Sequence, residues 1–155
     1  MANYLSISTK SVEQGQGRLP KLRGQINPTK TVSSDTTLYD YESGSVVLMG
    51  SNGVDITLPA AAAGLNFTVI QTADYATAVC TIIQAAATED FYGALYGTSQ
   101  GESAGTDSDV GVSANTKITF SSASLKGDRV RLVSDGTVWY VEAFAQNTAA
   151  ITFDN

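Results

Sequence analysis

The chain has few of the residue types that carry out chemistry at neutral pH. It contains no histidine and one cysteine, Cys80. Nucleophilic Ser-His and Cys-His pairs, imidazole metal sites and multi-thiolate zinc sites within one chain are therefore excluded. No GxxxxGKS/T or GxGxxG sequence stands between a strand and a helix, and no spacing marks out the carboxylate pair of a glycosidase. We expect no catalytic residue, cofactor or metal site, and therefore no enzyme.

Two other groups of residues have side chains that bind ligands in other proteins. Asp107-Ser108-Asp109 is similar to the start of a calcium loop, but the third acid at EF-hand spacing and the closing glutamate are missing. We interpret this segment as a solvated polar loop. Phe91, Tyr92 and Tyr96 could stack on a sugar or pack on a neighbouring subunit, although ordinary edge packing is the commoner role. Cys80 lies among apolar neighbours, which favours a buried thiol.

The charge is divided unevenly along the 155 residues, whose net charge is −6. Residues 1–34 carry five basic residues against one acidic residue, +4 in net charge, whereas residues 35–155 carry four against fourteen, −10 in net charge. A basic segment joined to an acidic body indicates a segment that meets an acidic partner. We do not expect the body to bind nucleic acid. We expect no membrane span and no secretory signal, because no apolar run approaches about 20 residues.

Residues 1–34 are expected to form an extended arm. Glycine and proline recur in this segment, and no helical or strand period survives in it beyond a short strand predicted at Tyr4–Ser8. The alternative is a flexible N-terminal segment that the protein does not need for its function. For a partner-binding arm, basic side chains would pair with carboxylates and apolar ones would fill small pockets. The candidate residues are Arg18, Leu19, Lys21, Leu22, Arg23, Ile26 and Lys30.

The clearest element of the body is a β-hairpin at Gly127–Ala143. Its two β-rich runs flank Asp135-Gly136, a preferred pair for a two-residue type I′ turn. That turn would place Leu132 opposite Trp139 and predicts one apolar face, because directly opposed residues share a face. The residues of that face are Val130, Leu132, Trp139 and Val141, with Arg131, Val133, Val138 and Tyr140 on the other.

A second hairpin is predicted around Asn52-Gly53, with Val47, Met49, Val54, Ile56 and Leu58 on one face. Pro59–Gly64 is expected to be one helical turn or a loop. The segment 85–115 is expected to be irregular, with a strand or loop at 91–97. Further strands are predicted at Thr36–Glu42, Asn66–Gln71, Thr77–Gln84, Thr116–Ser124 and Ala149–Phe153.

Many short strands and no convincing helix predict an all-β domain over residues 35–155, a jelly roll or β-sandwich, preceded by the arm of residues 1–34.

Two segments carry a resemblance to a known class of protein. ITLPAAAAGLNFTVI (Ile56–Ile70) and GDRVRLVSDGTVWYVEAF (Gly127–Phe144) resemble, in this order, segments of the β modules of tailed-phage virion proteins. Such modules occur in head decoration (cement) proteins and in tail-fibre or adhesin domains. The resemblance implies a trimeric protein and brings no catalytic residue with it.

The resemblance and the basic arm together favour a capsid decoration protein. A homotrimer would bind the major capsid protein on the capsid exterior of the virion, and the arms would staple capsid subunits together. The alternative is a tail-fibre or adhesin module that recognises a host-surface glycan through the loop at 91–109. The cement interpretation gives the arm a function, whereas in the alternative the arm is a link to the tail.

Overall fold

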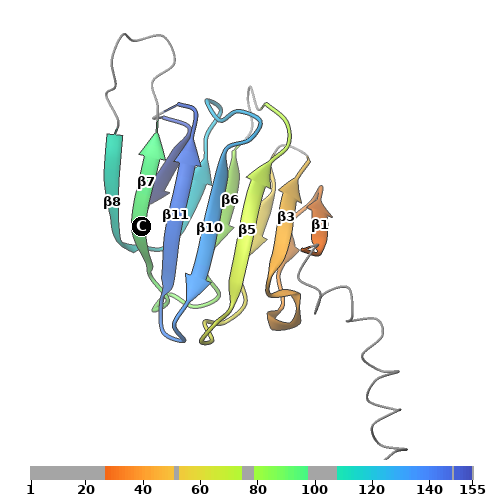
Figure 1. Ribbon diagram of the computed structural model, residues 1–155, viewed down its shortest axis with the longest axis vertical. Helices are drawn as coiled ribbons and strands as arrows, with labels where there is room; N and C mark the ends of the chain where they lie inside the picture. Colours follow the sequence, from red (N-terminus) through yellow and green to blue (C-terminus); the bar gives the residue numbers. More distant parts are fainter. Residues whose placement is uncertain (1–26, 51–52, 75–78, 98–107, 148, 155) are drawn as a thin grey trace, which may run out of the picture.

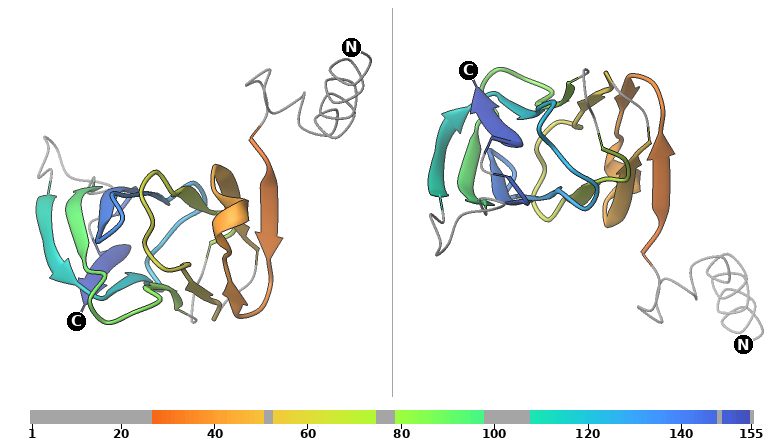
Figure 2. Two further views of the ribbon diagram at one scale, coloured as in Figure 1. Left: turned by 90° about the horizontal axis from the view of Figure 1, so that it is seen from below. Right: turned by 90° about the horizontal axis from the view of Figure 1, so that it is seen from above.

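A computed structural model describes residues 27–50, 53–74, 79–97, 108–147 and 149–154, and only the backbone of residues 108–113. These residues form two β-sheets that face each other as a sandwich (Figures 1 and 2). The prediction of an all-β sandwich is confirmed. Half of the strand pairings are parallel, whereas a jelly roll is built from antiparallel Greek keys, so nothing in the pairing confirms the jelly-roll alternative.

The larger sheet has seven strands and faces the viewer in Figure 1. In spatial order these are β1 (Thr29–Val32), β3 (Ser45–Met49), β5 (Asn66–Gln71), β10 (Arg129–Ser134), β11 (Trp139–Ala145), β7 (Phe91–Gly97) and β8 (Ser108–Asn115).

The smaller sheet has five strands and lies behind the larger one. In spatial order these are β12 (Ile151–Asp154), β9 (Lys117–Phe120), β6 (Cys80–Ile83), β4 (Asp55–Thr57) and β2 (Thr36–Thr37). One turn of 3-10 helix, Asp40–Glu42, follows β2.

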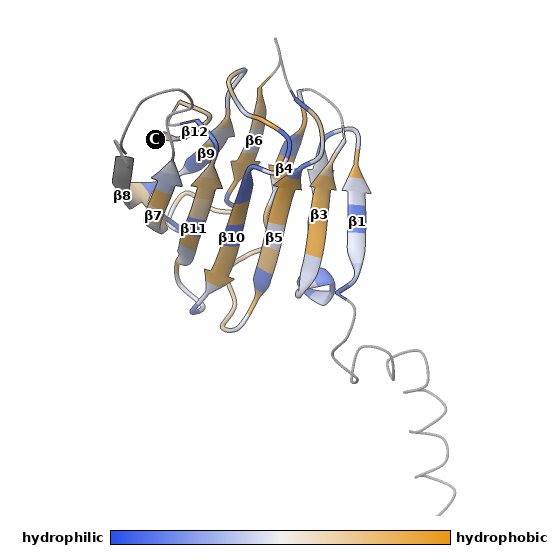
Figure 3. Ribbon diagram, turned by 45° about the horizontal axis from the view of Figure 1, so that its top comes forward, coloured by the Kyte–Doolittle hydropathy of each residue, from blue (hydrophilic) through white to orange (hydrophobic). Residues whose placement is uncertain are grey.

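The core lies between the sheets because inward side chains alternate with outward ones along the strands. Strand β11 shows this most clearly, since every second residue from Trp139 to Ala145 is buried. Figure 3 shows the same alternation as bands of apolar and polar residues along β10 and β11. Trp139, the first residue of β11, is fully buried, and its ring centroid lies 6.1 Å from that of Phe67. Cys80 is fully buried in the same core, as expected.

The hairpin predicted at Gly127–Ala143 is present as β10 and β11, but its register differs. Ser134 pairs with Trp139, and Leu132 pairs with Val141, so the loop has four residues instead of two. The prediction of a two-residue turn is wrong because the Asp135 carboxylate accepts hydrogen bonds from the backbone N–H groups of Thr137 and Val138. A shift of two residues leaves the faces unchanged, and the predicted apolar face is buried.

The second predicted hairpin does not form. Strand β3 belongs to the large sheet, where it pairs in parallel with β1 and β5, while β4 belongs to the small sheet. The chain crosses from one sheet to the other between Gly50 and Val54. The apolar face predicted there is buried nevertheless, because the same inward residues can face the core from two sheets.

The outcome of the remaining predictions differs from one segment of the chain to the next. Strand β5 has the predicted bounds, and β6 and β9 lie within their predicted segments. Strand β12 overlaps the segment predicted at Ala149–Phe153 and ends one residue after it, at Asp154. Pro59–Gly64 is a loop, one of the two forms expected. The segment 85–115 is less irregular than predicted, because it contributes β7 and β8. The strand predicted at Tyr4–Ser8 lies outside the described residues.

Strand β1 lies within the segment expected to be an arm. It pairs in parallel with β3 at the edge of the large sheet, and Val32 is buried opposite Met49. Backbone pairing and one buried side chain are enough to hold a four-residue edge strand without any period in its sequence. Part of residues 27–34 therefore belongs to the sandwich.

Candidate functional site

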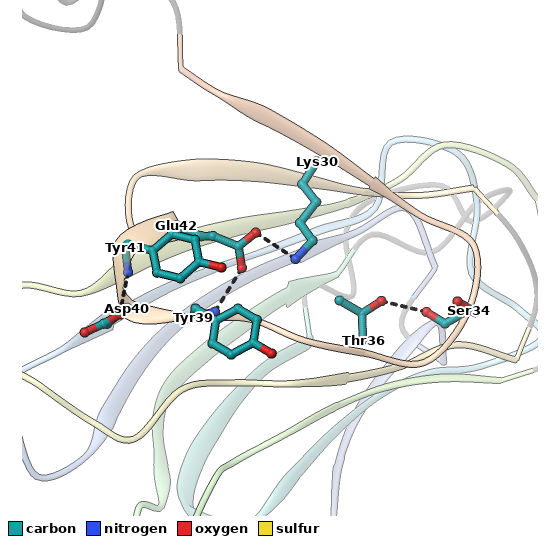
Figure 4. A network of polar contacts seen from close by, with 7 residues as sticks. All are labelled: Lys30, Ser34, Thr36, Tyr39, Asp40, Tyr41 and Glu42. Carbon is teal, nitrogen blue, oxygen red and sulfur yellow. Dashed lines mark hydrogen bonds and ion pairs between the residues drawn. The ribbon is translucent and has the colours of Figure 1, made fainter. Parts of the chain in front are cut away.

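The first candidate site is the surface where the chain leading from residue 26 joins the sandwich. We call it the arm-root surface, made of Pro28, Lys30, Tyr39, Asp40, Tyr41 and Glu42. Lys30 Nζ lies 2.7 Å from Glu42 Oε1, so β1 is tied to the 3-10 turn (Figure 4). Both side chains are partly exposed, and such a pair contributes at most about 1 kcal/mol of stability. Its main consequence is to fix β1 relative to the 3-10 turn.

The 3-10 turn is held by its own carboxylates. Glu42 Oε2 accepts a hydrogen bond from the backbone N–H of Tyr39 at 2.9 Å, and Asp40 Oδ1 accepts one from Tyr41 at 2.7 Å. Burial acts to raise the pKa of Glu42, but the hydrogen bonds from Lys30 and Tyr39 and the charge of Lys30 together hold it below its usual range. The turn is thereby fixed with Glu42 ionised.

The fixed turn displays two tyrosines. The rings of Tyr39 and Tyr41 stack with centroids 5.3 Å apart and planes 6° from parallel (Figure 4). They are 51% and 75% exposed. Tyr39 lines a hollow of about 540 Å³ with the loop at 57–62, and Tyr41 lines one of about 220 Å³ with Pro28 and Lys30. Large exposed aromatic rings next to hollows are typical of surfaces that contact another protein.

The arm residues predicted from the sequence fall mostly outside this surface. Arg18, Leu19, Lys21, Leu22, Arg23 and Ile26 lie outside the described residues. Lys30 is described, and its ammonium group is paired with Glu42 within the chain. A contact between Lys30 and a carboxylate of another protein stays a prediction, and it would have to compete with this pair.

The second candidate site is on the outer face of the large sheet. The parallel register of β7 and β11 places Tyr92 beside Tyr140, and Tyr96 beside Phe144. Alternation points these four side chains away from the core. We call them the aromatic rows. The sequence singled out Tyr92 and Tyr96 and placed Tyr140 outward; Phe144 was missed, although the alternation of β11 was a signal for it. Phe91, the third aromatic considered, is buried in the core.

The aromatic rows are held in place by their neighbours. The rings of Tyr96 and Phe144 stack with centroids 5.3 Å apart and planes 24° from parallel. The guanidinium carbon of Arg129 lies 4.5 Å from the centroid of the Phe144 ring, a cation–π distance. In the other row, the Tyr140 hydroxyl donates a hydrogen bond to Asp135 Oδ2 at 3.0 Å. Three of the four rings thus have a partner that limits their rotation.

Between the aromatic rows the surface is hollow. The hollow has a volume of about 440 Å³, within the range of small-molecule sites. Gly93 and Ala94 line it from β7, and an ion pair lines it from β10 and β11, with Arg131 Nη1 3.4 Å from Glu142 Oε2. A Cβ on Gly93 would lie 1.9 Å from the carbonyl oxygen of Val141, so only glycine fits there.

One buried carboxylate is structural. Asp128 is fully buried, and its side chain accepts hydrogen bonds from the backbone N–H groups of Leu125 and Gln146 at 2.8 and 2.9 Å. These bonds tie the chain before β10 to the chain after β11. The Gly-Asp pair at the start of the phage-like segment at 127–144 is therefore explained by the fold rather than by a ligand.

Among the described residues, no group of three or more cysteines or acids could hold a metal ion. Asp107 lies outside these residues, and the side chain of Asp109 is not described, so the calcium alternative stays untested. No helix in the described part of the chain is long and apolar enough to cross a membrane.

Comparisons with protein-family models, with curated proteins and with solved structures found no match to this chain. The geometry above and the resemblance of the two segments are therefore what bears on function.

Proposed function

We propose that the chain is a capsid decoration protein that binds the outside of a phage head and stabilises the assembled shell. The resemblance supports this proposal through two segments that meet in space. Ile56–Ile70 contains all of β5 except its last residue, and Gly127–Phe144 contains β10, which pairs antiparallel with β5. These two strands lie side by side at the centre of the large sheet, whereas Ile56 and Thr57, at the start of the first segment, belong to β4 of the small sheet.

The observation that carries the proposal is the exposed, stacked pair of Tyr39 and Tyr41 at the arm-root surface. The pair lies where the basic residues 1–26 join an otherwise acidic body. A docking end that combines apolar rings with an adjoining basic segment fits an acidic, partly apolar protein surface such as a capsid subunit. The rings supply the buried area, and the basic residues supply steering and charge pairing.

Stabilisation of the shell then follows from binding alone. A protein that binds only the assembled capsid shifts the equilibrium toward assembly by mass action and needs no chemistry. A homotrimer would place three arm-root surfaces on neighbouring capsid subunits, so that their contacts add through a raised effective concentration. The trimer is part of the proposal.

The test uses expanded heads of the encoding phage that were assembled without this protein. Two variants remove parts of the proposed docking end: one lacks residues 2–26, and the other carries Tyr39→Ala and Tyr41→Ala. Co-sedimentation with the heads measures binding. We expect each variant to bind at least about tenfold more weakly than the unaltered chain, the equivalent of 1.4 kcal/mol.

The matched control is Tyr92→Ala, which removes a tyrosine from the aromatic rows and leaves the arm-root surface intact. It should bind heads like the unaltered chain. Emission from Trp139, buried in the core, reports whether each variant is folded. If both docking variants are folded and still bind as tightly as the control, the cement function is wrong.

The alternative, a fibre or adhesin module, was expected to bind a glycan through the loop at 91–109. Residues 98–107 of that loop lie outside the described residues, and 91–97 form β7. The feature that a sugar would fit is the hollow between the aromatic rows. A sugar site does not by itself decide where on a virion the chain is mounted, so it is argued separately below.

A further inference from the structure

We propose that the hollow between the aromatic rows binds one neutral hexopyranose unit of a surface polysaccharide. This inference does not depend on the cement function, because it concerns a different face of the sandwich. It differs from the loop-based glycan site expected from the sequence, since the contacts come from two paired strands of the rigid sheet.

The spacing of the rows matches a sugar ring. In both β7 and β11 the aromatic side chains are four residues apart, which corresponds to about 13 Å along a strand. In the middle of this interval β7 carries Ala94, and β11 carries Glu142. The small side chain of Ala94 leaves a space between two aromatic walls that is wide enough for one pyranose ring. The volume of about 440 Å³ also leaves room for a linkage to the next unit.

The chemistry of the lining matches a sugar as well. A pyranose has C–H faces that pack against aromatic rings, and hydroxyls at its edge that both donate and accept hydrogen bonds. The tyrosine rings can pack against the C–H face of the sugar. The Arg131 guanidinium offers donors, and the Glu142 carboxylate offers acceptors, with side chains 63% and 60% exposed and so accessible.

The ligand is expected to be neutral because the charged groups at the hollow cancel. Arg131 and Glu142 lie opposite each other in the β10–β11 register and form an ion pair at 3.4 Å. A ligand with a carboxylate or phosphate would compete with Glu142 for Arg131 and leave the Glu142 carboxylate beside its own negative charge. A ligand with hydroxyls alone can bridge both groups without breaking the pair.

The walls are ordered before the ligand arrives. Tyr96 is stacked on Phe144, whose ring also contacts Arg129. Tyr140 is held by its hydroxyl on Asp135. Side chains that are already fixed lose less rotational freedom on binding, so a larger share of the contact free energy appears as affinity.

The experiment is a printed array of neutral and acidic bacterial polysaccharides, followed by calorimetry with the polymers that bind. The full chain should bind neutral hexose polymers selectively. Tyr92→Ala and Tyr96→Ala should each weaken binding by at least about tenfold. Ala94→Leu should do the same by filling the hollow, and because Ala94 lies on the outer face it adds no clash in the core.

The matched control is Tyr41→Ala, which removes an exposed tyrosine at the arm-root surface. It should leave sugar binding unchanged. The proposal is overturned if no neutral polymer binds, if only acidic polymers bind, or if Tyr41→Ala weakens binding as much as Tyr96→Ala. Each variant is checked by its melting temperature. A negative array leaves head binding by Tyr39 and Tyr41 untouched, so failure here and failure of the cement function are distinguishable.

Discussion

The hydroxyl of Tyr140 donates a hydrogen bond to the carboxylate of Asp135, 3.0 Å away across the loop of the β10–β11 hairpin. The same carboxylate accepts hydrogen bonds from the backbone of Thr137 at 2.8 Å and of Val138 at 3.1 Å. One side chain therefore both shapes the loop and holds a ring of the aromatic rows. The predictions that follow for these two residues concern opposite ends of the pH scale.

Asp135 should contribute stability that disappears in acid. The hydrogen bonds from Val138, Thr137 and Tyr140 hold its pKa well below the usual range. A carboxyl group whose pKa is lowered on folding stabilises the fold above its unfolded pKa, about 4, and this contribution is lost as the pH falls through the folded pKa. We expect Asp135→Asn to lower the melting temperature at neutral pH, by an amount that shrinks below about pH 4.

Paired melting curves of the two proteins from neutral pH into acid measure this difference. The other carboxylates titrate in both proteins, so they cancel in the comparison. A difference in melting temperature that stays constant across the acid range would show that the ionised Asp135 does not stabilise the folded hairpin.

Tyr140 should show the reverse dependence in alkali. Its hydrogen bond to Asp135, and the negative charge of Asp135, raise the pKa of Tyr140. A group whose pKa is raised on folding stabilises the fold below its unfolded pKa, about 10 for tyrosine, and loses that contribution as the pH rises through the folded pKa.

The measurement is the ultraviolet titration of tyrosinate in the unaltered chain, in Tyr140→Phe and in Asp135→Asn. The difference between the first two isolates Tyr140 among seven tyrosines. We expect it to titrate above the ordinary tyrosine range and to return toward that range in Asp135→Asn. An unchanged midpoint in Asp135→Asn would contradict the assignment of the shift to this hydrogen bond.

Gly93 is expected to tolerate no side chain. A Cβ there would lie 1.9 Å from the carbonyl oxygen of Val141 in the paired strand, so the two backbones would have to separate. We expect Gly93→Ala to lower the free energy of unfolding by roughly 2–3 kcal/mol, as measured by urea denaturation. Gly44→Ala is the control, because its φ of +84° is also positive but its Cβ would meet nothing within 4 Å. It should cost only about 1 kcal/mol; equal costs would argue against a close approach at Gly93.

Trp139 is expected to be replaceable by phenylalanine at moderate cost. Its side chain is fully buried, and its indole N–H has no hydrogen-bond partner among the described residues. Removing an unpaired buried donor offsets part of the lost packing, so Trp139→Phe should cost about 1–2 kcal/mol, against about 3–5 for Trp139→Ala. Urea unfolding followed by circular dichroism measures both. A cost for Trp139→Phe equal to that of Trp139→Ala would indicate that the indole N–H is satisfied.

The sequence predicted which side chains face the core much better than which strands pair. Val47, Met49 and Ile56 are buried as expected, although β3 and β4 lie in different sheets. Alternation of apolar and polar residues reports only that one face is covered, and either sheet can cover it. The Asn52-Gly53 pair favours a hairpin turn, but in this fold parallel pairing of β3 with β5 replaces the local antiparallel one.

The residues that make up the candidate sites were harder to predict from the sequence than the core. Tyr92 and Tyr96 were singled out by their type, but their neighbours Tyr140 and Phe144 come from a strand more than forty positions later, and only the parallel register brings them together. At the arm root, the pairing of Lys30 with Glu42 depends on the placement of β1 beside the 3-10 turn. No periodicity in residues 27–34 indicates that strand, so the ion pair could not be foreseen.

The interleaving of the two sheets has a consequence for folding during synthesis. Strand β5 ends at Gln71, and β10, its antiparallel partner at the centre of the large sheet, begins only at Arg129. Strand β6 likewise pairs with β9, which is synthesised more than thirty residues later. When only the first half of the chain has been synthesised, β5 and β6 are therefore present without β10 and β9, the strands that pair with them in the finished sheets. We expect the sandwich to form late and in one cooperative step, and truncated chains that end before β10 to aggregate or to require chaperones rather than to accumulate as a folded half.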